Sequence, residues 1–199
     1  MISNILRRTP LKTFIIPGDN DWNDCPYPDE AMRYWMKYFN RFDKNWNTKF
    51  FPGVNRHWIV TQNWSFKLRH CLFVGLNLVG GDVNDKDEWN LRLQENIGFV
   101  QYRLRLVSWY INTVVIFGHT ALRENVSIFF DGLVETARLY PHISFLYVHG
   151  DGHYWISDFP WKDAPNLGRV QLDKGALAPP VLISVKSTGG WPFEFNRRL

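Results

Sequence analysis

The sequence predicts an α/β fold with a mixed central sheet flanked by helices and antiparallel strands near the C-terminal end. Three short apolar runs carry this prediction, and each ends beside glycine with His or Asp close by. The runs cover residues 13–16, 113–117 and 144–148. Segments with helical periodicity separate them, and alternation of strand and helix is typical of parallel strands with helices packed on the faces of the sheet.

The first half of the chain is expected to contain two helices and three strands. Residues 13–16 form the first predicted strand, and residues 28–43 form a helix with one aromatic face. Two further strands are predicted at 57–64 and 69–78, joined as a hairpin around 65–68. A long amphipathic helix follows, capped by Asp87 and reaching about residue 110.

The second half continues the alternation and then changes character. Residues 113–117 form a strand, residues 122–140 a helix and residues 144–148 the next strand. Residues 168–172 and 181–185 then alternate between apolar and polar side chains, and we expect them to pair as an antiparallel finish.

Composition indicates one globular domain over residues 1–199, because 45% of the residues are hydrophobic and 21% are charged. The net charge of +4 and the isoelectric point near 9.1 fit an anionic substrate such as a phosphate ester. The basic residues form no run that would indicate nucleic-acid binding. Cys25 and Cys71 do not form a disulfide framework.

No targeting or membrane segment is visible. No apolar run approaches the roughly 18 residues that a membrane span needs, and the first twelve residues lack the apolar centre of a secretory signal. We therefore expect no membrane span. The compartment stays open, with the cytoplasm as the default.

Polar side chains follow the three apolar runs, where strands of open α/β sheets commonly carry functional groups. Asp19, Asn20 and Asp21 follow the first run, and His119 follows the second. His149, Asp151 and His153 follow the third. A lone His at a strand end is more often structural than a ligand, so the coincidence of three such ends carries the prediction. Carboxylate, amide and imidazole groups are ligands for divalent cations.

These motifs resemble those of the calcineurin-like metallophosphoesterases. Residues 18–21 (GDND) lie where that family has Gly-Asn-His-Asp/Glu, and His119 in FGHT matches its lone His. Residues 150–153 (GDGH) match its Gly-His-x-His element, with Asp151 in place of the first His. A subgroup with the wording GDNE-W-x-D-C and HGDxHY resembles residues 18–25 and 149–154 nearly letter for letter.

The resemblance implies divalent cations such as Mn, Fe or Zn, with Asp19, His119, Asp151 and His153 as ligands. It implies hydrolysis of phosphate mono- or diesters by metal-activated hydroxide. Asn20 lies where the family has its general-acid His, and an amide cannot transfer a proton usefully. A shift of the match by one residue would instead make Asn20 a neutral metal ligand. Asp21 or His149 would then serve as the acid, and His149 would also contact the substrate.

The family also has Asp-x-His and Gly-Asp-x-x-Asp elements, which should lie before residue 13. Their absence predicts a fold truncated at its N-terminus that binds one cation at most, with an exposed sheet region that favours self-association or a covering partner. The first alternative is a catalytically dead phosphoesterase fold that serves as a binding or structural subunit. A second alternative, suggested by the 10 Trp residues, is a carbohydrate-binding module.

Overall fold

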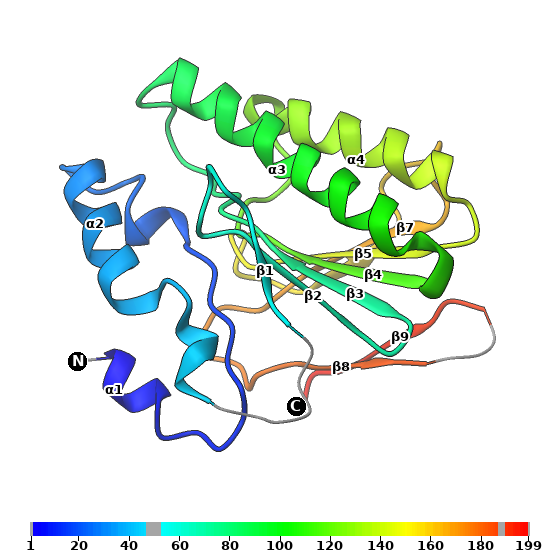
Figure 1. Cartoon of the computed structure of the whole chain (residues 1–199), viewed down its shortest axis with the longest axis horizontal. Helices are drawn as coiled ribbons and strands as arrows, with labels where there is room; N and C mark the ends of the chain where they lie inside the picture. The colour runs from blue at the N-terminus through cyan, green and yellow to red at the C-terminus, as the bar shows by residue number, and fades with distance from the viewer. Residues whose placement is uncertain (1, 47–52, 187–189, 199) are drawn as a thin grey trace.

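A computed structural model of the chain describes residues 2–46, 53–186 and 190–198. Figure 1 shows a central sheet with two long helices packed across one face. The helices are α1 (Ile2–Leu6), α2 (Pro28–Phe39), α3 (Lys86–Val107) and α4 (Ser127–Leu139). Four 3-10 turns are η1 (Asp19–Asp21), η2 (Phe42–Asn45), η3 (Ser108–Tyr110) and η4 (Glu124–Val126).

The central sheet has seven strands in the order β1-β2-β3-β4-β5-β7-β6. These are β1 (Asn55–Arg56), β2 (Trp64–Leu68), β3 (Cys71–Gly75), β4 (Thr113–Phe117), β5 (Ser144–His149), β6 (Ile156–Asp158) and β7 (Leu167–Gln171). β3, β4, β5 and β7 are parallel, whereas β1, β2 and β6 join antiparallel at the edges. β8 (Leu182–Val185) and β9 (Phe193–Asn196) form a separate antiparallel pair. The predicted α/β fold with a mixed sheet flanked by helices is confirmed.

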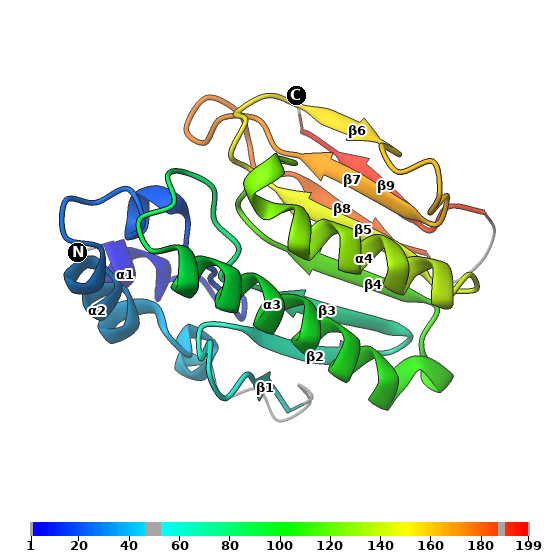
Figure 2. The ribbon, with the colours of Figure 1, turned by 90° about the horizontal axis from the view of Figure 1, so that it is seen from above.

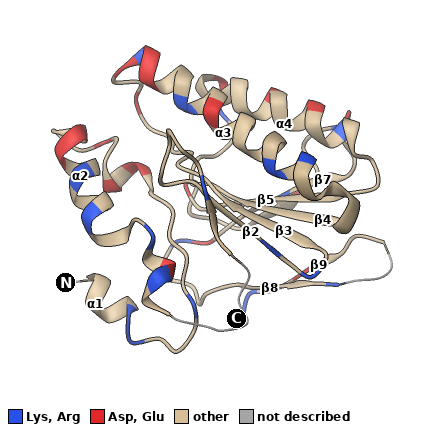
Figure 3. Cartoon of the chain, viewed as in Figure 1, with Lys and Arg blue, Asp and Glu red and all other residues tan. Residues whose placement is uncertain are grey.

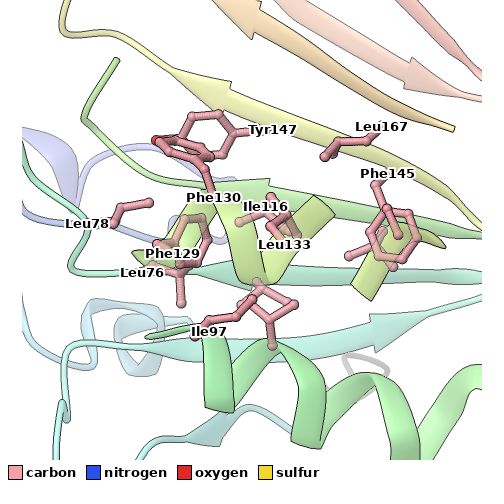
Figure 4. Packing of buried hydrophobic residues seen from close by; sticks show 14 of the residues in the cluster. Leu76, Leu78, Ile97, Ile116, Phe129, Phe130, Leu133, Phe145, Tyr147 and Leu167 are labelled. Atoms are coloured by element: carbon pink, nitrogen blue, oxygen red, sulfur yellow. The ribbon is translucent and has the colours of Figure 1, made fainter. Parts of the chain in front are cut away.

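The core lies on both faces of the central strands, because successive side chains of a strand point to opposite faces. Val114 and Ile116 of β4 pack with α3 and α4, while Val115 packs on the opposite face with Phe193 of β9. Figure 4 shows the helix-side layer, in which Phe129 and Phe130 of α4 lie close to residues of the sheet. β8 and β9 lie across the other face (Figures 1 and 2). The central strands are therefore covered on both sides.

Charged side chains recur along α3, the longest helix (Figure 3). None of the helices in the described part of the chain combines the length and the apolar character that crossing a bilayer requires. The prediction that the chain has no membrane span agrees with this finding.

The predicted strand at residues 13–16 is wrong, because this segment is extended but belongs to neither sheet. Side chains fix it instead. The Phe14 ring lies 4.7 Å from the rings of both Trp64 and Phe66, and the Trp64 Nε1 donates to the Ile15 carbonyl at 3.0 Å. An apolar run predicts burial of this segment, and here aromatic packing on β2 leaves it half-buried without any strand pairing.

The predicted hairpin exists, but its turn lies at residues 69 and 70 rather than at 65–68. Arg69 takes a left-handed backbone with φ of 53°, which closes the turn between β2 and β3. Residues 57–63 form bends and a turn instead of a strand. The cap of α3 is also displaced, since the Asp85 carboxylate accepts from the backbone N–H groups of Asp87 and Glu88.

The predicted pairing of residues 168–172 with 181–185 is wrong. β7 joins the central sheet parallel to β5, and β8 pairs with β9. The three-residue strand β6, which was not predicted, forms the sheet edge beside β7. The two edge strands, β1 and β6, are short, as is common where sheets avoid edge-to-edge pairing. Self-association of the chain stays a prediction.

Gly75 provides the first test of this packing. It lies opposite Trp64, and a Cβ atom at position 75 would lie 2.2 Å from Trp64 Cε2. We expect Gly75→Ala to displace the indole and to lower the free energy of unfolding by about 1–3 kcal/mol, as measured by urea denaturation. The matched control is Gly175→Ala, whose Cβ would meet no described atom within 4 Å and whose effect should stay within about 0.5 kcal/mol. Equal losses in the two variants would contradict this account.

Candidate metal centre

Three of the predicted ligands converge at the carboxyl ends of the parallel strands. Asp19 belongs to η1, His119 follows β4, and Asp151 follows β5. One ligand atom of each lies within 4.8 Å of the other two, and this is the one such group of three found among the described residues. His119 Nε2 and Asp19 Oδ1 are 3.0 Å apart. The predicted convergence of three separate segments is therefore present.

The peptide groups of His119 connect the neighbouring loops. The His119 N–H donates to the carbonyl of Leu78, in the loop after β3, at 2.8 Å. The His119 carbonyl accepts from the N–H groups of Gly150 and Asp151, in the loop after β5, at 3.4 and 3.1 Å. Backbone hydrogen bonds thus fix the positions from which the His119 and Asp151 side chains extend.

Asp19 comes from outside the sheet, and amide side chains bind its loop to the loop after β3. The Asn23 Nδ2 donates to the carbonyls of Gly80 and Asp82 at 3.3 and 3.0 Å. The Asn84 Nδ2 in turn donates to the Asn23 carbonyl at 2.7 Å. These bonds place Asp19, whose residue is only 6% exposed, against the strand ends.

Asp151 Oδ2 accepts from the Arg123 guanidinium at 2.8 Å and from the Ala121 N–H at 3.2 Å. Gly80 lies against the same carboxylate. A Cβ at position 80 would lie 3.1 Å from Asp151 Oδ2 and 3.6 Å from Asp19 Oδ2. The absence of a side chain at Gly80 therefore leaves room beside both carboxylates.

The donor set fits a divalent cation of the first transition series. Two carboxylates and one imidazole offer oxygen and nitrogen ligands, which suit Mn, Fe or Zn. Further acidic residues lie nearby along the chain, as Figure 3 shows for the loop around η1 and the starts of α2 and α3. The two buried or half-buried carboxylates also carry more negative charge than the single Arg123 that reaches them.

The other residues predicted at this site lie around the three ligands. Asn20 and Asp21 are exposed; the Asn20 N–H donates to Asp19 Oδ1 at 2.7 Å, and Asp21 Oδ2 accepts from the Gly18 N–H at 2.8 Å. His153 is exposed and lies outside the group of three, on a left-handed backbone with φ of 61°. Of the four predicted ligands, the structure brings three together and leaves His153 apart.

His149, predicted to contact substrate or to act as an acid, lies beneath the site with 1% of its surface exposed. Its ring stacks on Tyr147 at 5.2 Å, and neither ring nitrogen has a hydrogen-bond partner among the described residues. Burial, followed by the charge of Arg169, lowers the His149 pKa to about 4. A neutral, enclosed imidazole offers a substrate no contact surface in this conformation.

Two residues of this site were not predicted from the sequence. Gly80 lies just beyond the strand predicted at 69–78 and has no predicted role, and Arg123 falls within the helix predicted at 122–140. A pair of glycines directly after a largely apolar run was the signal for Gly80, because such pairs let a backbone approach closely. No signal pointed to Arg123, since its contact with Asp151 depends on the fold of two loops.

Comparisons with known proteins add no relative. A scan against protein-family models and a search of curated proteins both gave no match for this chain. The resemblance to calcineurin-like phosphoesterases thus rests on the quoted motifs and stays a prediction.

Substitution of Gly80 tests the space beside the two carboxylates. We expect Gly80→Ala to weaken Mn²⁺ binding, measured by isothermal titration calorimetry, by about tenfold, the scale of changes beside metal ligands. The matched control is Gly150→Ala, next to Asp151 in sequence, because its Cβ would meet no described atom within 4 Å. An unchanged dissociation constant in Gly80→Ala would show that the space has no part in cation binding.

The depressed His149 pKa makes the fold sensitive to acid. The unfolded chain takes up this proton near pH 6.5 and the folded chain only near pH 4, so stability is complete above pH 6.5 and is lost as the pH falls toward 4. The expected loss is on the order of 3 kcal/mol, measured by urea denaturation with chelator present. His149→Phe should flatten this slope. His142→Phe, at an exposed histidine, should keep it, and identical slopes in the two variants would refute the assignment.

Proposed function

We propose that this chain is a metal-dependent phosphoesterase that binds one divalent cation at Asp19, His119 and Asp151. The observation that carries the proposal is the meeting of their three ligand atoms within 4.8 Å, from segments far apart in sequence. The quoted phosphoesterase motifs support the same assignment. Because the set has three protein ligands and His153 lies apart, we propose weak hydrolysis of phosphate mono- or diesters.

A bound cation would act as a Lewis acid toward a phosphoryl oxygen and would favour ionisation of water. The chain supplies the positioning. Asp19 and Asp151 provide the negative charge that attracts a cation, and the backbone bonds at His119 keep the ligands together without it. Binding would therefore require little rearrangement of the backbone, which lowers its cost.

Arg123 supports recognition of the phosphate ester. Its side chain is 46% exposed and pairs with Asp151 at the edge of the group. A guanidinium matches the geometry of phosphate oxygens with two parallel N–H donors. We propose that it turns from Asp151 to the ester and orients it.

Asp21 is the proposed general acid. It is exposed beside Asp19, and one of its oxygens accepts from the Gly18 N–H, which leaves the other oxygen for a proton. Asn20 can donate a hydrogen bond to the substrate but cannot transfer a proton usefully. This arrangement provides a general acid and is consistent with slow turnover.

A second candidate is a binding or structural subunit without catalysis. One observation favours it: the side chains satisfy one another without a cation. Asp19 Oδ1 accepts from the Asn20 N–H and lies 3.0 Å from His119 Nε2, while Asp151 Oδ2 accepts from Arg123 and from the Ala121 N–H. In that case the group would act only as a polar clamp between loops.

Cation binding and turnover together separate the two candidates. The proposed enzyme should gain about 2.7 kcal/mol of stability at Mn²⁺ concentrations 100 times the dissociation constant. It should also release nitrophenol from p-nitrophenyl or bis(p-nitrophenyl) phosphate in a Mn²⁺-dependent manner. Asp19→Asn should lower the affinity for Mn²⁺ and the Mn²⁺-dependent turnover by at least about tenfold each.

The matched control is Asp82→Asn, since Asp82 is an exposed carboxylate in the neighbouring loop outside the group of three. The Mn²⁺ affinity and the turnover of this variant should equal those of the unsubstituted chain. Cation binding without any turnover would favour the second candidate, a binding or structural subunit without catalysis. Absence of both stabilisation and turnover would reject the phosphoesterase proposal.

A further inference from the structure

A second candidate site lies between β1 and α3, away from the metal centre. Its cavity has a volume of about 530 Å³ and is lined by residues around β1 and by one face of α3. Figure 2 shows β1 at the edge of the sheet beside this helix. The volume falls in the range of small-molecule sites. None of its lining residues belongs to the group at Asp19, His119 and Asp151.

Gly98 is the first feature of this cavity that packing does not explain. It lies inside α3, where glycine is less favourable than alanine. A Cβ at position 98 would meet no described atom within 4 Å. Gly132 of α4 differs, because its Cβ would lie 2.7 Å from Ile97 Cγ1, so close helix packing accounts for it. At Gly98, the missing side chain keeps space open in the cavity wall.

Arg103 is the second feature. Two other basic side chains of the cavity have acidic partners: Arg56 pairs with Asp43, and His57 Nε2 lies 3.1 Å from Glu95. Arg103 has no acidic partner among the described residues, and its buried Nε has no hydrogen-bond acceptor there. A half-buried guanidinium without a counter-charge favours an anionic ligand.

Aromatic rings complete the cavity. Trp58 is 83% exposed and Tyr102 is 50% exposed, although both line the cavity. Exposed rings of this size offer flat faces on which a planar ligand can stack. The combination of ring faces and one unpaired guanidinium selects a ligand that is planar at one end and negatively charged at the other.

We propose that this cavity binds a planar aromatic ligand that carries an anionic group, with a nucleoside monophosphate as the simplest probe. The base would stack on Trp58 or Tyr102, and the phosphate would accept from Arg103. The space above Gly98 would admit the part of the ligand that joins them. This site is independent of the proposed phosphoesterase function.

Titration with AMP in the presence of EDTA tests the proposal, because chelation removes any contribution from the metal centre. Two further titrations separate the contributions: adenosine lacks the negative charge, and inorganic phosphate lacks the aromatic ring. We expect AMP to bind at least about tenfold more tightly than either arm, as measured by isothermal titration calorimetry. Adenosine binding as tightly as AMP would refute the role of the charge, and phosphate binding as tightly would refute the role of the ring. Absence of AMP binding would overturn the proposal.

Variants locate the site. Gly98→Ala should keep or raise the melting temperature, by about 2 °C, since alanine favours the helix. It should nevertheless weaken AMP binding by about tenfold, and Arg103→Gln should do the same. Trp109→Leu, at an 87% exposed ring outside this cavity, is the control for loss of an aromatic side chain and should bind normally. Normal AMP binding by Gly98→Ala and Arg103→Gln would overturn the assignment. Asp19→Asn should bind AMP normally, because Asp19 lies outside this cavity.

Discussion

The peptide groups of His119 join three parts of the chain that would otherwise be separate loops. They bond the end of β4 to Leu78 on one side and to Gly150 and Asp151 on the other. Backbone bonds of this kind do not depend on side-chain rotamers, so they fix the geometry of the loops firmly. The positions of His119 and Asp151 depend on this fixation, whereas the side-chain bonds of Asn23 and Asn84 hold the loop that carries Asp19.

The hydrophobic core also holds the loop that carries His119. Tyr147, fully buried on β5, donates its hydroxyl to the Thr120 carbonyl at 2.7 Å, directly after His119. The same ring lies against Gly118, where a Cβ would approach the Tyr147 hydroxyl to 2.7 Å. Figure 4 shows Tyr147 in the layer with Phe129 and Phe130. Aromatic packing beneath the strands is thereby coupled to the position of the loop that carries His119.

The sequence predicted the middle of the fold well, because 113–117 and the start of β5 are continuous apolar runs bounded by polar residues. The prediction failed where an apolar run can be covered in two ways, by pairing in a sheet or by side-chain packing outside it. Residues 13–16 are half-buried through Phe14 and its ring contacts, and a strand pattern cannot exclude that outcome. The alternating pattern in β7 likewise predicts a strand but does not determine which strand it pairs with, which here is β5.

The site was predictable as far as residue type and strand end could define it. Three predicted ligand residues meet as expected, but only His119 and Asp151 follow parallel strands, whereas Asp19 comes from a segment outside the sheet. His153 did not join them, because the left-handed backbone at that residue is a property of the folded loop. Arg123 and Gly80 escaped prediction for the same reason: their roles arise from contacts between loops that are distant in sequence.

Coverage of both sheet faces has a consequence for strand alignment. In β4, Val114, Val115 and Ile116 are all buried, so a slip by one position would exchange one apolar side chain for another. Hydrophobicity alone therefore leaves the alignment of this strand nearly degenerate. The polar groups at its two ends remove that degeneracy: Thr113 Oγ1 donates to the His70 carbonyl, and the His119 N–H donates to Leu78. The polar groups at the two ends of β4, which include the His119 backbone in the candidate metal centre, thus select one alignment of the buried strands from several of similar apolar content.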